Sequence, residues 1–306
     1  MSGQKEIGLI GTVTYDVITS DSGEVYRGLG GILYQAAVLS ALEKNVFLFT
    51  NLGNELSSQV EKATHNWETL KREGIRQVPG PGNRVHLHYP EKGERQEILE
   101  SVVPPINPQD ALRCLGRLHM LVFVLNSGFD MILSDWRRIA DAAGCPIWLD
   151  IHSLVLSREL KTPRKFLSNI SWKNWARGAT YLQVNHTELS CLLGRVGQEL
   201  SEEDLNLFSR AAFEIGLRAV FITLGWEGVL VLTPNRARIL SPSHAGNVKD
   251  TTGCGDVFCA VTVKELVEGV DLFFAARAGV ELATRATAVR GIEETFELIR
   301  QIIRRD

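Results

Sequence analysis

The segment that decides the fold reads Asp250-Thr-Thr-Gly-Cys-Gly-Asp256 and continues directly into an amphipathic stretch at residues 257–266. Gly253 and Gly255 permit backbone angles that point several N–H groups in one direction, and the helix that follows adds its positive end. An anion is stabilised at such a turn, so the segment predicts a phosphate site. The alternative is an ordinary helix start in which Asp256 only caps the first turn.

Asp256 falls in the first turn of this helix, beside the predicted phosphate site. A carboxylate placed there can accept the proton of a hydroxyl group that attacks the phosphorus. Position and chemistry therefore both favour Asp256 as a general base.

Upstream of this segment, short apolar runs alternate with stretches that have helical spacing. The runs are typical of buried strands, and such strands separated by helices predict a mostly parallel sheet covered on both faces. The fold class is therefore α/β, and 306 residues fit one domain, residues 1–306. The predicted strands are residues 7–10, 46–49, 121–125, 147–149, 181–184 and 219–222. The predicted helices are residues 32–42, 131–143, 205–215, 257–267 and 273–288.

One segment, residues 84–99, departs from this rhythm and alternates around the turn Pro-Glu-Lys-Gly-Glu. The pattern predicts a β-hairpin, which does not fit into the core of a parallel sheet. We expect it to project as a lid, or to pair with a short strand at residues 24–27, so that the lid comprises about residues 20–28 and 83–100. An exposed hairpin edge invites pairing with a second copy, which predicts a homodimer through the lid.

Composition excludes several classes of protein. A net charge of -3 with 23% charged residues gives no field that would attract nucleic acid or a membrane surface. The five cysteines are odd in number and never spaced as CxxC, which argues against a disulfide framework and a zinc knuckle. A reducing, cytoplasmic location follows. We expect no signal peptide and no membrane-spanning helix, because no apolar run is long enough.

Two further motifs follow predicted strands, at the edge of the sheet where α/β proteins bind ligands. Asn185-His-Thr-Glu188 offers an amide and a carboxylate three residues apart, which can hold hydrated Mg²⁺. The competing interpretation is a helix capping box. Thr223-Leu-Gly225-Trp-Glu-Gly228 places glycines where the backbone can approach phosphate or ribose, and the competing interpretation is a hairpin turn.

Near the N-terminus, Asp16 follows the first strand and Gly30-Gly31 precedes a helix, so both can line a pocket. A dinucleotide site would need GxGxxG, but residues 8–13 read GLIGTV. The Walker A pattern GxxxxGK[ST] is also absent from the sequence. A P-loop kinase and a dinucleotide-binding enzyme are therefore excluded.

Together, DTTGCGD, NHTE, TLGWEG and the Gly30-Gly31 region resemble motifs of the ribokinase-like, PfkB-type carbohydrate and nucleoside kinase family, and their order along the chain also matches. The resemblance covers nearly the whole chain and implies an enzyme that moves the γ-phosphate of ATP to a hydroxyl of a sugar or sugar-like molecule. It implies Asp256 as the general base and the amides of Gly253, Cys254 and Gly255 as the anion hole. Phosphoryl transfer needs mainly alignment and charge stabilisation, which these groups supply.

The resemblance also implies the ligands of the cofactors and of the substrate. Asn185 and Glu188 would order Mg²⁺, and Asp250 and Thr252 match positions that bind a monovalent cation such as K⁺ in many members. The residues implied along ATP are Asn185, Thr223, Gly225 and Gly228, and those implied at the substrate hydroxyls are Asp16, Gly30, Gly31 and Gln35.

Three positions depart from the family pattern: Gln35 where sugar kinases commonly have Asn, Cys254 for the usual Ala, and His152 near the usual Asn. The extra methylene of Gln35 moves its amide by more than about 1 Å, which is enough to misplace a substrate hydroxyl. A common sugar therefore does not follow as the acceptor. The alternatives are a catalytically weak or inactive ligand-binding or regulatory homologue, a nucleoside kinase, and a vitamin-precursor kinase, against which the hairpin argues.

Overall fold

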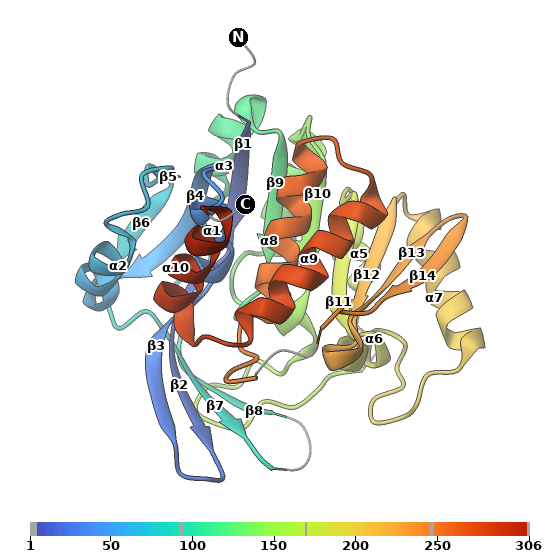
Figure 1. Ribbon diagram of the computed structural model, residues 1–306, viewed down its shortest axis with the longest axis horizontal. Helices are drawn as coiled ribbons and strands as arrows, with labels where there is room; N and C mark the ends of the chain where they lie inside the picture. The colour runs from blue at the N-terminus through green and yellow to red at the C-terminus, as the bar shows by residue number, and fades with distance from the viewer. Residues whose placement is uncertain (1–4, 92–94, 169, 245–247, 305–306) are drawn as a thin grey trace.

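The structure, a computed structural model, describes residues 5–91, 95–168, 170–244 and 248–304. Within them, ten strands form a central sheet in the order β14-β13-β12-β11-β10-β9-β1-β4-β5, with β6 also paired to β4 (Figure 1). Along this sheet order, the strands from β12 to β5 all run parallel to their neighbours. The pairs β12–β13 and β13–β14 are antiparallel. The strands are β1 (Glu6–Ile10), β4 (Asn45–Gly53), β5 (Leu70–Lys71), β6 (Ile75–Val78), β9 (Met120–Val124), β10 (Ile147–Asp150), β11 (Tyr181–Asn185), β12 (Ala219–Thr223), β13 (Val229–Thr233) and β14 (Arg236–Leu240).

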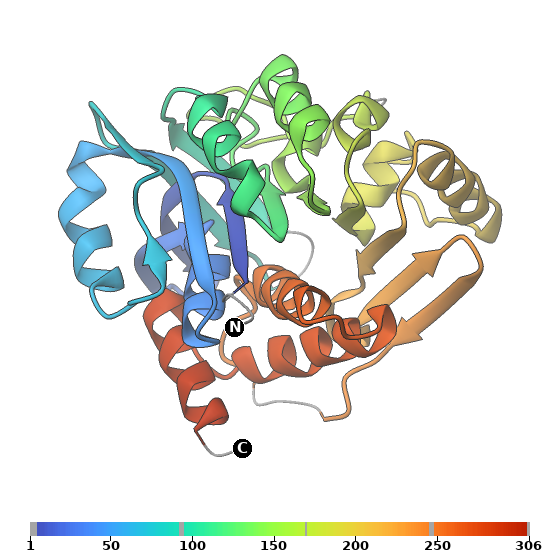
Figure 2. The same ribbon diagram turned by 90° about the horizontal axis from the view of Figure 1, so that it is seen from above.

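Helices cover both faces of the sheet, as the view from above shows (Figure 2). One face packs against α1, α8, α9 and α10, and the other against α3 to α7. This confirms the predicted α/β class and the five predicted helices to within three residues at each end. The helices are α1 (Leu33–Ala41), α2 (Ser57–Thr64), α3 (Pro108–Cys114), α4 (Leu133–Ala142), α5 (Trp172–Ala176), α6 (His186–Leu192), α7 (Glu202–Glu214), α8 (Cys254–Val267), α9 (Leu272–Ala286) and α10 (Gly291–Ile303).

Aromatic side chains fill the two layers between the sheet and its helices. On one side Trp148 stacks on Phe221 with ring centroids 4.5 Å apart, and on the other Phe123 stacks on Trp136 at 4.6 Å. Trp172 and Trp175 are also buried in the second layer. These two indoles therefore belong to the core.

A second, four-stranded sheet in the order β3-β2-β7-β8 projects from the carboxyl edge of the central sheet and forms the lid (Figure 1). Its strands are β2 (Val13–Ser20), β3 (Val25–Gly31), β7 (Asn83–Tyr89) and β8 (Gln96–Ser101). The predicted hairpin is present as β7 and β8, although residues 92–94 of its turn lie outside the described residues.

The predicted pairing of this hairpin with residues 24–27 is wrong, because β2 lies between them: it pairs with β7 on one side and β3 on the other. The lid is accordingly larger than residues 20–28 and 83–100. β2 escaped prediction because its sequence, VTYDVITS, mixes polar residues into the strand pattern and includes Asp, a poor strand former.

The segment after η3 (His152–Val155) fastens the lid to the central sheet. The backbone N–H groups of Lys161 and Arg164 donate to the carbonyl oxygens of Leu99 and Glu97 on β8, each at 2.8 Å. The edge of β8 is therefore already used by the chain itself. This weakens the argument that an open hairpin edge invites a second copy.

Two expectations about the chain's chemistry can be compared with the structure. None of the five cysteines, all of which lie within the described residues, forms a disulfide. Among the described residues, no helix combines the length and the apolar character needed to cross a bilayer.

Candidate functional site

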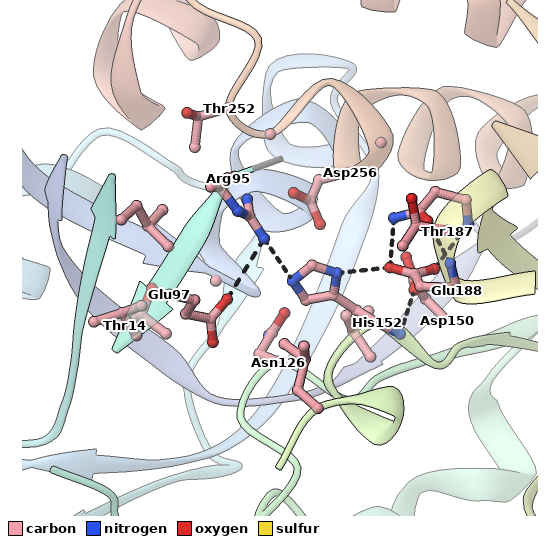
Figure 3. Close-up of a pocket in the computed structure, with 18 of the residues that line it drawn as sticks. Thr14, Arg95, Glu97, Asn126, Asp150, His152, Thr187, Glu188, Thr252 and Asp256 are labelled. Atoms are coloured by element: carbon pink, nitrogen blue, oxygen red, sulfur yellow. Dashed lines mark hydrogen bonds and ion pairs between the residues drawn. The ribbon is translucent and has the colours of Figure 1, made fainter. Parts of the chain in front are cut away.

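A cavity of about 450 Å³ lies where the lid, the carboxyl ends of the central strands and the first turn of α8 meet (Figure 3). Most of the candidate residues line it, which brings together motifs from distant parts of the chain. The candidates that line the cavity are Asp16, Gly31, Asn185, Glu188, Thr223, Thr252, Gly253, Gly255 and Asp256. The candidates that do not line it are Gly30, Gln35, Gly225, Gly228, Asp250 and Cys254.

The glycine turn is built as an anion site. Gly253 caps α8 with a φ of +81°, a conformation that favours glycine, and a Cβ there would come within 2.5 Å of the ring of Tyr34. The turn is held from below by Asp250, whose Oδ1 accepts from the N–H of Thr252 at 2.8 Å. The start of a 14-residue helix thus lies at the cavity, which Gly253, Gly255 and Asp256 line.

Cys254 contributes its backbone to this turn but not its thiol. Its Sγ approaches the carbonyl oxygen of Ala283 at 3.7 Å, and burial raises the pKa of the thiol to about 12. The side chain is therefore a packed, protonated group that points away from the cavity.

Asp256 has the properties of a base that works near neutral pH. Burial raises its pKa to about 6, while the positive charges of His152 and Arg95 and a hydrogen bond from Gln35 act in the opposite direction. The Nε2 of Gln35 lies 2.5 Å from Oδ1 of Asp256. A carboxylate with this pKa is mostly charged at pH 7 and can still hold a proton during reaction.

The Asn185-to-Glu188 motif forms a full capping box at the start of α6. Oε2 of Glu188 accepts from the N–H of Asn185 at 2.8 Å, and Oε1 accepts from Nδ2 of Asn185 at 2.7 Å and from Nδ1 of His152 at 3.0 Å. The competing capping interpretation of this motif is therefore confirmed. It does not exclude the metal role, because Glu188 also lines the cavity.

The surroundings of Glu188 fit a hydrated cation better than a fully enclosed one. Asp150 is a second carboxyl group near Glu188, and burial and the charge of Glu188 both raise its pKa. Two neighbouring carboxyl groups behave in this way when nearby positive charge does not neutralise both of them. Among the described residues, no cluster of three or more His, Cys, Asp or Glu side chains has the geometry to enclose a metal. Mg²⁺ binds in such places through one or two carboxylates, waters and phosphate oxygens.

The candidate nucleotide motif is the turn between the antiparallel strands β12 and β13, so the hairpin interpretation also holds. Thr223 ends β12 and lines the cavity. The fold itself requires glycine at position 228, because φ is +102° and a Cβ there would lie 2.1 Å from the carbonyl oxygen of Leu240. Gly225 has φ at +61°, and a Cβ there would meet no atom within 4 Å.

The lid brings Asp16 into the cavity from β2. Burial raises the pKa of Asp16 to about 7, with a hydrogen bond from Thr14 opposing the change. Gly30 faces this carboxyl group, because a Cβ at Gly30 would come within 2.1 Å of Oδ2 of Asp16. Gly30 therefore leaves room for Asp16, and Gly31 reaches the cavity itself.

Sequence reasoning missed the cationic side of the cavity. Arg95, from the lid, has three long contacts. Figure 3 shows two of them: Nη2 lies 3.5 Å from Oε2 of Glu97 and 3.4 Å from Nε2 of His152. In the third, Nη1 lies 3.5 Å from the hydroxyl oxygen of Tyr89. Burial opposes the charged form of His152, but its hydrogen bond to Glu188 and the charge of that carboxylate outweigh burial and raise its pKa. Arg164, whose side chain is 0% exposed, also lines the cavity and binds Oε1 of Glu97 at 2.6 Å.

The proposed ligands of a monovalent cation already have partners. Oδ2 of Asp250 pairs with Nε of Arg290 at 3.2 Å, and the hydroxyl of Thr252 lies 3.1 Å from that of Tyr89. Arg290 also pairs with Glu24 before β3. The guanidinium of Arg290 thus neutralises the Asp250 carboxylate. Asp250 and Thr252 therefore do not fit a K⁺ site.

Comparisons with known proteins also indicate a kinase. A family profile described as "pfkB family carbohydrate kinase" matches residues 6–297. The chain is 32% identical over 132 residues to the bifunctional protein HldE of Coxiella burnetii, a match that covers 41% of the chain and 27% of that relative's length.

Solved structures show the same fold. The chain superimposes on Arabidopsis thaliana ribokinase, solved with ribose and ATP, with a TM-score of 0.74 and 17% identity over 97% of the chain and 99% of the ribokinase. A sulfate complex of a pyrophosphate-dependent kinase in the ribokinase family gives a TM-score of 0.78 at 17% identity, over 95% of the chain and 99% of that kinase. At these identities the likeness establishes the fold.

Proposed function

Since the chain belongs to the pfkB family of carbohydrate kinases, we propose that it moves the γ-phosphate of ATP to a hydroxyl group of a sugar or sugar-like small molecule. The observation that carries the proposal is one cavity that contains a glycine-rich helix N-terminus, a neighbouring carboxylate poised near neutral pH, and a second buried carboxyl group from the lid. The first two features match phosphoryl transfer, and the third suits a polyhydroxylated acceptor.

The reaction needs a proton acceptor and a place for the moving phosphoryl group. The acceptor hydroxyl attacks the γ-phosphorus, its proton passes to Asp256, and the bond to the β-phosphate oxygen breaks to release ADP. The N–H groups of Gly253, Cys254 and Gly255 stabilise the charge on the phosphoryl oxygens. The positive side chains of Arg95 and His152, whose charges act on Asp256, offset further negative charge in the same cavity.

We assign the remaining ligands from their positions in the cavity. Asn185 and Glu188 would hold hydrated Mg²⁺, which when bound neutralises charge on the phosphates of ATP. Thr223 would contact ATP, while the glycines at 225 and 228 shape the turn that carries it. Asp16 and the backbone at Gly31 would bind acceptor hydroxyls, because a carboxyl group with a pKa near 7 can donate or accept a hydrogen bond.

Location and assembly are proposals as well. Five cysteines that form no disulfide among the described residues suit a reducing cytoplasm. A homodimer through the lid stays a prediction, and since the edge of β8 is already bonded to residues 161–164, a second copy would need another lid surface. Light scattering at micromolar concentration that shows only a monomer would remove the dimer.

The test is an assay of ADP release over pentoses, hexoses, sugar acids, polyols and nucleosides, with and without Mg²⁺. We expect Asp256→Asn to lower kcat on the order of 10² to 10⁴-fold. The control Asp141→Asn, at an exposed position of α4, should leave kcat unchanged. Full turnover by Asp256→Asn would contradict the mechanism. Calorimetric binding of a sugar without ADP release would instead favour the inactive homologue.

The phosphate donor needs its own arm of this assay. One structural neighbour is described as a pyrophosphate-dependent kinase, so ATP and pyrophosphate should be compared with the same acceptor. Turnover with ATP and none with pyrophosphate is the expected result.

A further inference from the structure

Gln35 is the only long polar side chain in α1, a helix whose nine residues are all buried. It is fully buried, at 0% exposure. A polar group in such a place must find a partner, because burial without a hydrogen bond is costly. Its Nε2 donates to Oδ1 of Asp256 at 2.5 Å, whereas its Oε1 has no partner among the described residues. The side-chain amide of Gln35 is thus hydrogen-bonded to Asp256, the proposed base.

The resemblance to sugar kinases predicts a different role, a contact between residue 35 and substrate hydroxyls. The structure does not place Gln35 there: it does not line the cavity, although Tyr34 beside it does. Asp256 lines the cavity, whereas Gln35, which is hydrogen-bonded to it, does not. The methylene that distinguishes Gln from Asn gives the amide the reach to touch the base.

Successive residues of α1 support both ends of the anion turn. The ring of Tyr34 occupies the space where a side chain on Gly253 would be, as close as 2.5 Å. Gln35 holds the carboxylate three residues further on. α1 therefore contacts both the glycine turn of the phosphate site and the base.

The bond has a defined effect on the base. A donor to one carboxylate oxygen stabilises the charged form and opposes the effect of burial on the pKa of Asp256. It also fixes the plane of the carboxylate and uses one oxygen, so the second oxygen is available to the acceptor hydroxyl.

We propose that Gln35 is a positioning residue for the general base: its amide N–H holds Oδ1 of Asp256 and leaves Oδ2 to receive the proton of the acceptor. This rests on the proposed kinase function and deepens it. The chain then differs from sugar kinases with Asn at this position in how its base is oriented. Acceptor specificity would be determined by the lid residues rather than by residue 35.

Two variants test the proposal, with a control on the same helix. Gln35→Met keeps the volume and removes the donor, and Gln35→Asn shortens the amide so that it no longer reaches Asp256. Ser40→Ala is the matched control, because Ser40 is the other buried polar residue of α1 and its Oγ has no partner among the described residues. Circular dichroism and thermal unfolding show that each variant is folded before kinetics are compared.

We expect both Gln35 variants to lower kcat about tenfold and to change the acceptor KM less than about twofold. Without the donor the pKa of Asp256 rises, so the base stays protonated up to a higher pH. The acid limb of the plot of kcat against pH therefore shifts to higher pH, by about 0.5 to 1 pH unit. Ser40→Ala should change none of the three. A higher acceptor KM with kcat and the pH profile unchanged would overturn the proposal and identify Gln35 as a substrate ligand.

A second measurement does not depend on turnover. Titration of carboxyl-labelled aspartate by NMR, with Asp256 assigned through Asp256→Asn, reports the pKa of the base directly. We expect a higher value in Gln35→Met than in the wild-type protein and in Ser40→Ala. Equal values in all three would overturn the proposal even if no acceptor were found, whereas full turnover by Asp256→Asn would remove the kinase mechanism and leave this structural result standing.

Discussion

Replacing Glu97 with Gln tests how the lid is held over the cavity. The carboxylate binds Arg164, whose side chain is 0% exposed and whose other donors reach the carbonyl oxygens of Ser157 at 2.8 Å and Ser127 at 3.0 Å. The amide of the glutamine could still accept a hydrogen bond, but it would leave a buried guanidinium without a counter-charge. Breaking a buried ion pair in this way costs about 3–5 kcal/mol. Because one hydrogen bond is retained, we expect the lower end of this range, about 3 kcal/mol.

The assay is urea unfolding followed by circular dichroism and by tryptophan fluorescence, whose transitions must coincide before a free energy is derived. Glu100→Gln is the control on the same strand, because Glu100 pairs with His86 at the surface and should cost less than about 0.5 kcal/mol. The double variant Glu97→Gln, Arg164→Met should be less destabilised than Glu97→Gln alone. A cost for Glu97→Gln no larger than for Glu100→Gln would refute the reasoning.

Two further predictions concern positive charge around the cavity. Arg95→Met should lower kcat on the order of 10²-fold, because it removes positive charge from the cavity. It should change the unfolding free energy by less than about 1 kcal/mol, because the contacts of Arg95 are 3.4–3.5 Å long and its side chain is 30% exposed. An unchanged kcat in the ADP-release assay would contradict this prediction. Exchange of KCl for choline chloride at constant ionic strength should alter the wild-type rate by less than about twofold, because Arg290 already neutralises Asp250; a loss of about tenfold or more would show that a monovalent cation is needed.

The sequence predicted the parts of the site that are local. The glycine turn and Asp256 lie within seven residues, so their chemistry could be read from backbone freedom and helix polarity alone. The alternation of buried strands and helices likewise predicted the central sheet. The capping box at Asn185 and the packing of Gly228 against Leu240 show why single motifs remain ambiguous, since each has a structural reason to be present.

The rest could not be predicted because it depends on segments that only the fold brings together. Arg95 from the lid, His152 after β10 and Glu188 on α6 form one chain of contacts, but nothing in their spacing links them. Gln35 offered a signal that could have been used: a long polar residue in an otherwise buried, mostly apolar helix requires a buried partner. Its partner, 221 positions away, is visible only in the structure.

The central claim is that Asp256 accepts the proton of the acceptor, and the pH dependence of kcat/KM tests it most directly. Because burial raises the pKa of Asp256 to about 6, the rate should fall as pH decreases through this value, about tenfold per unit below it, and level off above it. The residual activity of Asp256→Asn should lack this acid limb. A wild-type rate that is constant from about pH 5 to pH 8, or an acid limb that persists in Asp256→Asn, would contradict the account.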